Sequence, residues 1–177
     1  RISHGEDGKI NKHYYPYFDS KTGDILGYKE RDVATKGFGI NGTNKGAGLF
    51  GQNIFKEGGK YLTITEGELD AMSVSEMFDG KWAVVSLKNG ASGALRDIKD
   101  NLTYIESFDN IVLCFDQDEA GKEAIKAVRD VISPNKLRLV TLPMKDASDM
   151  LMNGRIKDFT EAWWNAKGYT PAGIVRG

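Results

Sequence analysis

Four short apolar runs, separated by segments with helical spacing, constrain the fold of this chain most strongly. The runs are YLTIT (61–65), WAVVS (82–86), NIVLCF (110–115) and LRLVTL (137–142). The helical segments are predicted at 68–78, 94–105, 119–132 and 156–166. Strands separated by helices pair in parallel through right-handed crossovers. The alternation therefore predicts an α/β domain with a parallel sheet flanked by helices.

Acidic residues follow three of the four runs, as the pairs Glu66 and Asp70, Asp116 and Asp118, and Asp146 and Asp149. The carboxyl ends of parallel strands meet at one edge of a sheet, where open α/β sheets place their ligand sites. Carboxylates gathered there repel one another unless a cation neutralises them. Because Mg²⁺ prefers such oxygen ligands together with phosphate, the pattern predicts a metal-dependent enzyme that acts on phosphates.

Each acidic motif also has a structural interpretation when it is taken alone. Glu66 and Asp70 suit the start of a helix, where negative charge is favourable. FDQDEAG has some features of a calcium loop, but it lacks the glycine and glutamate spacing of an EF-hand. Three such motifs at successive strand ends favour one shared functional edge.

The first 60 residues differ from the rest in charge and in pattern. They carry ten Lys and Arg against seven Asp and Glu, whereas residues 61–177 carry 14 against 18. Short β-like pieces surround YYPYFD and ILGYKERDV, and the glycine-rich KGFGINGTNKGAG is predicted to be a loop. We expect a small, mostly β, basic subdomain over 1–57, a catalytic domain over 58–152, and a C-terminal helix and linker over 153–177.

The single cysteine and the absence of long apolar runs suggest an intracellular setting. Cys114 lies inside NIVLCF and is expected to be a packed core thiol, which fits a reducing compartment. No run has the length of a transmembrane helix, and no signal peptide is visible, so no membrane partner is expected. His4 and His13 with one cysteine cannot form a zinc-ribbon site, so zinc is not expected in this chain.

The acidic motifs together resemble a known family. The E-G-x-x-D of residues 66–70 and the D-x-D of 116–118 resemble the TOPRIM domain, which is shared by DnaG-type primases, topoisomerases and some nucleases. Four further stretches resemble the primases of bifunctional phage-type primase–helicases: GLFG (48–51), SLKNGAS (86–92), FDQDEAGKEA (115–124) and KDASDML (145–151). The resemblance covers about residues 14–160.

The resemblance implies a TOPRIM-type sheet and an RNA polymerase core that makes short primers on single-stranded DNA from ribonucleoside triphosphates. Glu66 would be the central acid, as a metal ligand or a proton acceptor. Asp116 and Asp118 would hold Mg²⁺ or Mn²⁺, with two ions in the chemistry. The acidic cluster would be completed or supported by Asp70, Asp146 and, least constrained by the family pattern, Asp149.

Basic residues would have to offset the phosphates of such substrates. The candidates for nucleotide or template contacts are Lys29, Arg31, Lys36, Lys88, Asn89, Lys122 and Lys145. The alternative for each is an ordinary solvated side chain. The aromatic residues of the N-terminal part are suited to stacking on template bases, but a role in the core of the β subdomain is favoured; they are Tyr14, Tyr15, Tyr17, Phe18 and Tyr28.

Primases of this type usually also carry a zinc module that reads the template and a helicase, so these domains of a parent protein are expected partners, in the cytoplasm of a bacterial host. Two other functions use the same scaffold. One is a metal-dependent nuclease or a topoisomerase-like cleavage enzyme. The other is a non-catalytic module that binds DNA or supports a helicase. Retention of all the mutually repelling carboxylates argues against the non-catalytic module.

Overall fold

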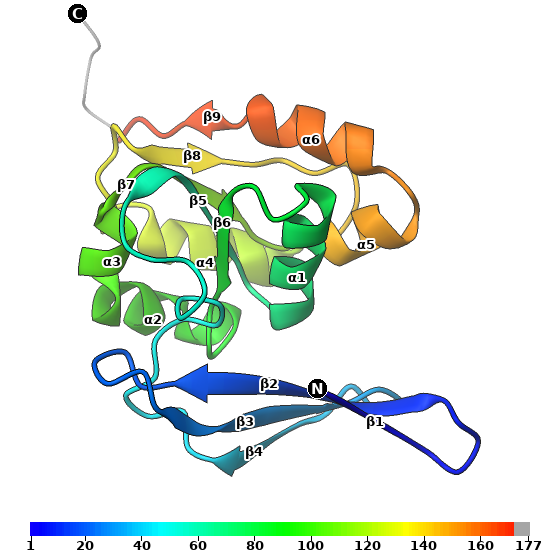
Figure 1. The fold of residues 1–177 in the computed structure, drawn as a ribbon. Coiled ribbons are helices and arrows are strands. Elements are labelled where there is room, and N and C mark those ends of the chain that lie inside the picture. Colours follow the sequence, from blue (N-terminus) through cyan, green and yellow to red (C-terminus); the bar gives the residue numbers. More distant parts are fainter. Residues whose placement is uncertain (172–177) are drawn as a thin grey trace, which may run out of the picture.

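Four N-terminal strands form an antiparallel sheet with the order β1-β2-β3-β4 (Figure 1). The computed structural model describes residues 1–171. The strands are β1 (Ile2–His4), β2 (Ile10–Phe18), β3 (Ile25–Asp32) and β4 (Phe38–Gly42). The small β subdomain predicted from the sequence is therefore present. The segment predicted to be a glycine-rich loop contains β4, so that prediction was wrong for residues 38–42.

Glycine accounts for the unexpected strand. A Cβ atom built on Gly42 would lie 2.6 Å from the carbonyl oxygen of Leu26, and one on Gly27 would lie 2.5 Å from that of Asn41. Gly42 also has a φ of +84°, which side chains other than glycine rarely adopt. The glycine content here permits close pairing of β3 and β4 rather than forming a loop.

The larger part of the chain is a five-stranded sheet with the order β6-β5-β7-β8-β9. Its strands are β5 (Gly59–Thr65), β6 (Ala83–Ser86), β7 (Phe108–Cys114), β8 (Leu137–Leu139) and β9 (Lys167–Gly168). The first four pair in parallel, as predicted, and β9 adds an antiparallel edge. The sheet is flanked by the helices α1 (Glu68–Met77), α2 (Ala94–Asp100), α3 (Leu102–Glu106), α4 (Glu119–Val128), α5 (Ala147–Met152) and α6 (Ile156–Trp164), with a short 3₁₀ turn at Ala91–Gly93.

The central strand β7 shows why the sheet needs helices on both faces. Ile111 and Leu113 join a core with residues of α2, α3 and α4, whereas Val112 and Cys114 join a core with residues of α1, α5 and α6 (Figure 1). Alternate side chains of a strand point to opposite faces, so a strand covered on both faces is a continuous apolar run. Cys114 is a buried core thiol, as predicted.

Several predicted boundaries differ from the structure. The helix predicted at 94–105 is divided into α2 and α3 at Asn101, whose side-chain amide donates to the carbonyl oxygen of Asp97 (2.9 Å). Such local bonds compete with helix continuation. Three further elements are shorter than predicted: the helix from 119 ends at Val128, the strand from 137 ends at Leu139, and the last helix ends at Trp164.

The C-terminal elements belong to the sheet. Nε1 of Trp163 on α6 donates to Oγ1 of Thr63 on β5 (2.9 Å), and β9 pairs with β8. Residues 172–177 of the predicted C-terminal helix and linker lie outside the described residues, and the domain boundaries stay a prediction. Within residues 1–171, no helix is both long and apolar enough to cross a membrane.

The two sheets meet through the inner face of β2. Tyr15 and Tyr17 are buried there and pack against Phe50, with ring centroids 5.7 and 6.1 Å away, and Leu69 of α1 completes the contact. This placement confirms the core role favoured for these two tyrosines. The junction fixes the N-terminal sheet opposite the start of α1, where the first acidic motif lies.

Candidate active site

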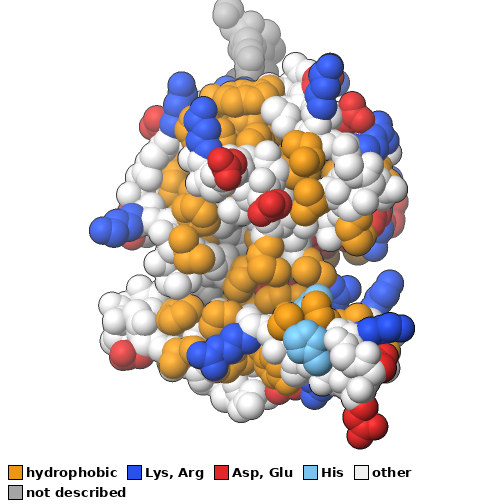
Figure 2. All heavy atoms as spheres, turned by 45° about the vertical axis from the view of Figure 1, so that its right-hand side comes forward, with side chains coloured by type: hydrophobic (Ala, Val, Ile, Leu, Met, Phe, Trp, Pro, Cys, Tyr) orange, Lys and Arg blue, Asp and Glu red, His pale blue; other side chains and the backbone are white. Residues whose placement is uncertain are grey.

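A cleft of about 940 Å³ lies between the N-terminal sheet and the carboxyl ends of β5 and β7. The molecule narrows at the junction of its two parts (Figure 2). One wall of the cleft comes from β3 and β4, and the other from the starts of α1 and α5 and from the loops after β6 and β7. Most of the acidic and basic residues that the sequence singled out reach this cleft.

Three carboxylates from three strand ends meet in the cleft. Asp70 lies in the first turn of α1, Asp116 follows β7, and Asp146 caps α5. One oxygen from each lies within 4.8 Å of those of the other two. Backbone N–H groups fix two of them: that of Ser148 donates to Oδ1 of Asp70 (3.0 Å), and that of Asp149 donates to Oδ1 of Asp146 (2.8 Å). The spacing suits one cation shared by three oxygen ligands.

The remaining predicted acids flank this trio. The backbone N–H of Asp116 donates to Oε1 of Glu66 (3.0 Å), which holds the Glu66 carboxylate against the chain at Asp116. Asp118 caps α4 by accepting from the backbone N–H of Gly121 (3.0 Å). Asp149 lies in the first turn of α5, and its carboxylate is not a member of the trio.

Lys145 forms ion pairs with two of these acids. Its Nζ lies 3.7 Å from Oδ2 of Asp116 and 3.8 Å from Oδ2 of Asp118. The charge of Asp116 makes the largest contribution to raising the pKa of Lys145, so the lysine stays protonated. One lysine at this distance offsets only part of the charge of the trio.

The site favours neutral carboxyl groups when no cation is bound. Burial, with the nearby charge of Asp116, raises the pKa of Glu66 to about 7. Burial, with the charge of Asp146, raises the pKa of Asp116 to about 6 and also raises the pKa of Asp70. Full ionisation therefore costs free energy that a divalent cation would offset. The chemistry of this donor set fits a hard, oxygen-preferring metal ion.

These shifts predict a pH dependence of stability in a chelating buffer. Because the folded pKa values of Glu66, Asp70 and Asp116 lie above those of the unfolded chain, their contribution to stability is complete below about pH 4 and is lost as pH rises through 6–7. Asp70→Asn removes one of these groups. The free energy of unfolding of the variant, measured with urea, is compared with that of wild type at each pH. We expect this difference to shift in favour of the variant by about 1–3 kcal/mol as the pH rises from 5 to 8. A difference independent of pH would contradict the assignment.

The residues predicted to contact a nucleotide or the template divide into three groups. Lys29, Arg31 and Lys145 line the cleft. Lys36 and Lys122 are absent from its lining. The Nζ of Lys122 instead lies 3.5 Å from Oε2 of Glu119 on the surface of α4. Lys88 and Asn89 line the cleft but have partners within the chain.

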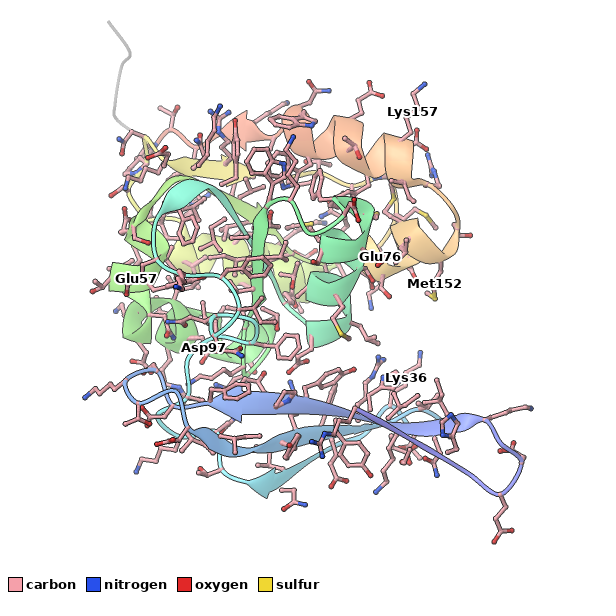
Figure 3. All side chains as sticks on the ribbon, viewed as in Figure 1. Lys36, Glu57, Glu76, Asp97, Met152 and Lys157 are labelled. Carbon is pink, nitrogen blue, oxygen red and sulfur yellow. The ribbon has the colours of Figure 1, made fainter. Side chains whose placement is uncertain are left out.

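These partners tie the loop after β6 to its surroundings. Nζ of the buried Lys88 donates to the carbonyl oxygen of Ala47 (2.8 Å), and Nδ2 of Asn89 donates to Oδ1 of Asp97 (2.7 Å). The backbone N–H groups of Lys88 and Asn89 donate to Oδ2 of Asp97 (2.8 and 2.9 Å). Asp97 lies on the side of the α/β part that faces the N-terminal sheet (Figure 3). These contacts hold both side chains in place at the edge of the cleft, and their role in binding a nucleotide or template stays a prediction.

Lys29 is held by a buried pair that the sequence did not reveal. Its Nζ donates to Oε1 of Glu68 on α1 (2.8 Å) and to the carbonyl oxygen of Lys88 (3.2 Å). The hydroxyl of buried Tyr17 donates to the same Glu68 oxygen (2.6 Å). A buried carboxylate that accepts two such bonds joins the N-terminal sheet to the start of α1.

Residues 63–151 match the Toprim-like family. The match includes half of the chain and all six candidate acids. The chain belongs to the Toprim-like family.

Individual relatives of this Toprim-like chain come from bacteriophages. It is 37% identical over 169 residues to a DNA helicase/primase of Enterobacteria phage T3, covering 94% of this chain and 30% of that protein. The chain therefore spans about a third of the length of this relative. It is 36% identical to the primase fragment of the bacteriophage T7 primase-helicase, with a TM-score of 0.81, covering 92% of this chain and 66% of that one.

Two further structures extend the comparison. One contains T7 lagging-strand DNA polymerase interacting with primase domains bound to an RNA/DNA hybrid and dTTP. The match to it has 38% identity and a TM-score of 0.81, and it covers 92% of this chain and 81% of that one. The other contains the zinc-binding and RNA polymerase domains of the Aquifex aeolicus primase. The match to it has 14% identity and a TM-score of 0.57, and it covers 94% of this chain and 44% of that one. The second shows a shared fold alone.

Tyr17→Phe tests how firmly the Toprim-like domain is joined to its N-terminal sheet. Removing the hydroxyl deletes one of the bonds to the buried Glu68 carboxylate, so we expect a loss of about 1–2 kcal/mol in the free energy of unfolding. Tyr14→Phe is the matched control, because its hydroxyl has only a 3.4 Å contact with Ser3. Equal stability of both variants would show that the Tyr17–Glu68 bond contributes little.

Gly121 and Arg96 lie at the site, although no sequence motif predicted a role for them. A Cβ on Gly121 would overlap the carbonyl oxygen of Asp116 and lie 2.7 Å from Oε1 of Glu66. The glycine therefore lets α4 pass closely behind both acids, and its place in FDQDEAG was the available signal. Arg96 lies on α2 and lines the cleft, and no motif around it indicates this placement.

Proposed function

We propose that this chain is the primase core of a primase–helicase, which synthesises short RNA primers on single-stranded DNA during DNA replication. The observation that carries the proposal is the convergence of Asp70, Asp116 and Asp146, with Glu66 beside them, in a cleft whose opposite wall carries Lys29 and Arg31. The Toprim-like match and the phage helicase/primase relative support this choice over other phosphate chemistry.

Some of the acidic residues would bind a cation, and one would accept a proton. Asp70, Asp116 and Asp146 would hold Mg²⁺ or Mn²⁺, with Asp118 and Asp149 supporting the cluster and a second ion. The bound metal ions would supply electrostatic stabilisation of the phosphates and lower the pKa of the attacking hydroxyl. Glu66, whose pKa is about 7, is suited to accept the proton of the primer 3′-hydroxyl near neutral pH.

The basic residues would position the substrates. Lys145 lies beside the acids, where its charge would offset that of the triphosphate. Lys29, with its ammonium fixed by Glu68, and Arg31 would contact the nucleotide or the template strand. The T7 primase domains bound to an RNA/DNA hybrid and dTTP support single-stranded DNA, RNA primer and nucleotide as partners. Zinc-binding and helicase domains of the parent protein are further proposed partners.

The proposal is tested by incubating the chain with ribonucleotides, Mg²⁺ or Mn²⁺, and single-stranded DNA carrying a short annealed RNA primer. We expect the primer to be extended, and Glu66→Gln to abolish extension because it cannot accept a proton. Cutting of the DNA in place of extension would overturn the proposal in favour of a nuclease. Neither activity, with DNA binding retained, would favour a non-catalytic module.

A further inference from the structure

One face of the N-terminal sheet is only half covered by the catalytic part. In the strand register Lys29 pairs with Tyr15 on one side and with Ile40 on the other, and Arg31 pairs with Phe38. Paired residues of neighbouring strands share a face. On this face Tyr15 is buried, whereas Phe38 is 60% exposed and Ile40 is 54% exposed. The β3–β4 end of the face therefore extends beyond the core contact.

The exposed end combines apolar side chains with cations. The Nζ of Lys29 lies 4.6 Å from the centroid of the Phe38 ring, and Cζ of Arg31 lies 6.0 Å from it. Phe38 and Ile40 line the same cleft as the carboxylates. Aromatic rings beside positive charges are typical of surfaces that bind single-stranded nucleic acid.

Away from the carboxylates, two arginines of the cleft are placed to meet the phosphates of a strand. The ammonium of Lys29 is paired with Glu68, so Arg31 carries the uncompensated charge of this wall. Arg96 faces the cleft from the other wall. Neither arginine forms an ion pair with a residue in 1–171. Nε of Arg31 is also buried without a hydrogen-bond partner within that range.

We propose that Phe38 and Ile40 form a base-binding platform for a single-stranded DNA segment. Phe38 stacks on one nucleobase, Ile40 contacts the next base, and Arg31 and Arg96 contact the phosphates. The platform rests on the proposed function, since its occupant is the template on its way to the acidic cluster. A protein module covering Phe38 is the competing occupant, and the experiment below separates the two.

The platform is tested with two fluorescent DNA oligomers of equal length, one with bases and one abasic throughout, by anisotropy of the whole chain at about 50 mM salt. Because stacking needs a base, Phe38→Ala is expected to weaken binding of the normal oligomer about tenfold and to leave the abasic one unchanged. Arg31→Gln is expected to weaken binding of both and to lower the salt dependence of log K by about 1.

Three further variants control the comparison. Phe38→Tyr keeps a ring and should bind like wild type, whereas Phe38→Leu keeps apolar bulk and should bind like Phe38→Ala. Met152→Ala alters a side chain that is 73% exposed on α5 and absent from the cleft lining, and should change neither affinity (Figure 3). Agreement of Phe38→Leu with wild type would exclude stacking and overturn the platform.

The remaining outcomes also decide the question. The platform would be overturned if Phe38→Ala weakened binding of both oligomers equally, or if wild type bound neither. It would also be overturned if Phe38→Ala changed the binding of neither oligomer, and this result would favour a protein occupant. Primer extension measured in parallel separates this inference from the proposed function. Base-dependent binding without extension would retain the platform and reject the polymerase. Primer extension that is unchanged in Phe38→Ala would retain the polymerase and reject the platform.

Discussion

Asp116→Asn is expected to lower RNA primer extension by at least about a hundredfold while the fold is retained. Asp116 is the member of the acidic trio whose backbone also contacts Glu66, and its carboxylate lies 3.7 Å from Lys145. Asparagine keeps the shape of the side chain but removes the negative charge that a cation requires. Because burial raises the pKa of Asp116 to about 6, a neutral amide at this position relieves repulsion and should not destabilise the chain.

The measurement is single-turnover extension of an annealed primer together with thermal unfolding in a chelating buffer. Asp109→Asn is a matched control, since Asp109 is an exposed aspartate near the opposite end of β7. It should extend primers like wild type. Activity of Asp116→Asn within threefold of wild type would remove Asp116 from the catalytic site. If the activity of Asp116→Asn fell only as much as its fraction of folded protein, Asp116 would have a structural role alone.

Gly121→Ala is expected to destabilise the chain by about 2–4 kcal/mol and to impair extension. Helix propensity alone predicts the opposite sign, a gain of about 1 kcal/mol, because alanine is favoured over glycine within a helix. The steric term is larger, since the new Cβ would overlap the backbone carbonyl of Asp116, which cannot move as a flexible side chain would. Relief of the overlap must shift α4 away from Glu66 and Asp116.

Unfolding by urea, compared with that of Gly39→Ala, measures this effect. A Cβ on Gly39 has no heavy atom within 4 Å, so that variant should change stability by less than about 0.5 kcal/mol. We also expect Gly121→Ala to lose activity at a temperature where it is fully folded. A Gly121→Ala protein that is as stable and active as wild type would show that the close approach of α4 is not required.

The positions of the acids were predictable because they depend on local pattern. The apolar run before Asp116 predicts a strand covered on both faces, and parallel strands place their carboxyl ends at one edge. That reasoning brought Asp70, Asp116 and Asp146 to one site without knowledge of any contact. It did not separate Asp149 from them, because Asp146 and Asp149 are three residues apart, a spacing that predicts the same side of a helix, and the sequence does not show that Asp146 precedes α5 as its cap.

Other parts of the site depend on contacts between residues far apart in the sequence. The bond from Lys88 to the carbonyl oxygen of Ala47 and the Tyr17–Glu68 bond form only when the two sheets meet. No local pattern distinguishes a lysine that binds a backbone carbonyl from one that binds phosphate. The strand β4 was missed for a related reason, because glycine permits both loops and close strand pairing.

The most direct test of a template-directed polymerase uses four DNA templates that differ in a single base beyond the same annealed RNA primer. Each template is offered each ribonucleotide separately, with Mg²⁺ or Mn²⁺ and with Asp116→Asn as the inactive control. The account predicts that each template selects its complementary ribonucleotide and that omission of the metal stops incorporation. Metal-independent incorporation, or incorporation of the same nucleotide on all four templates, would contradict it.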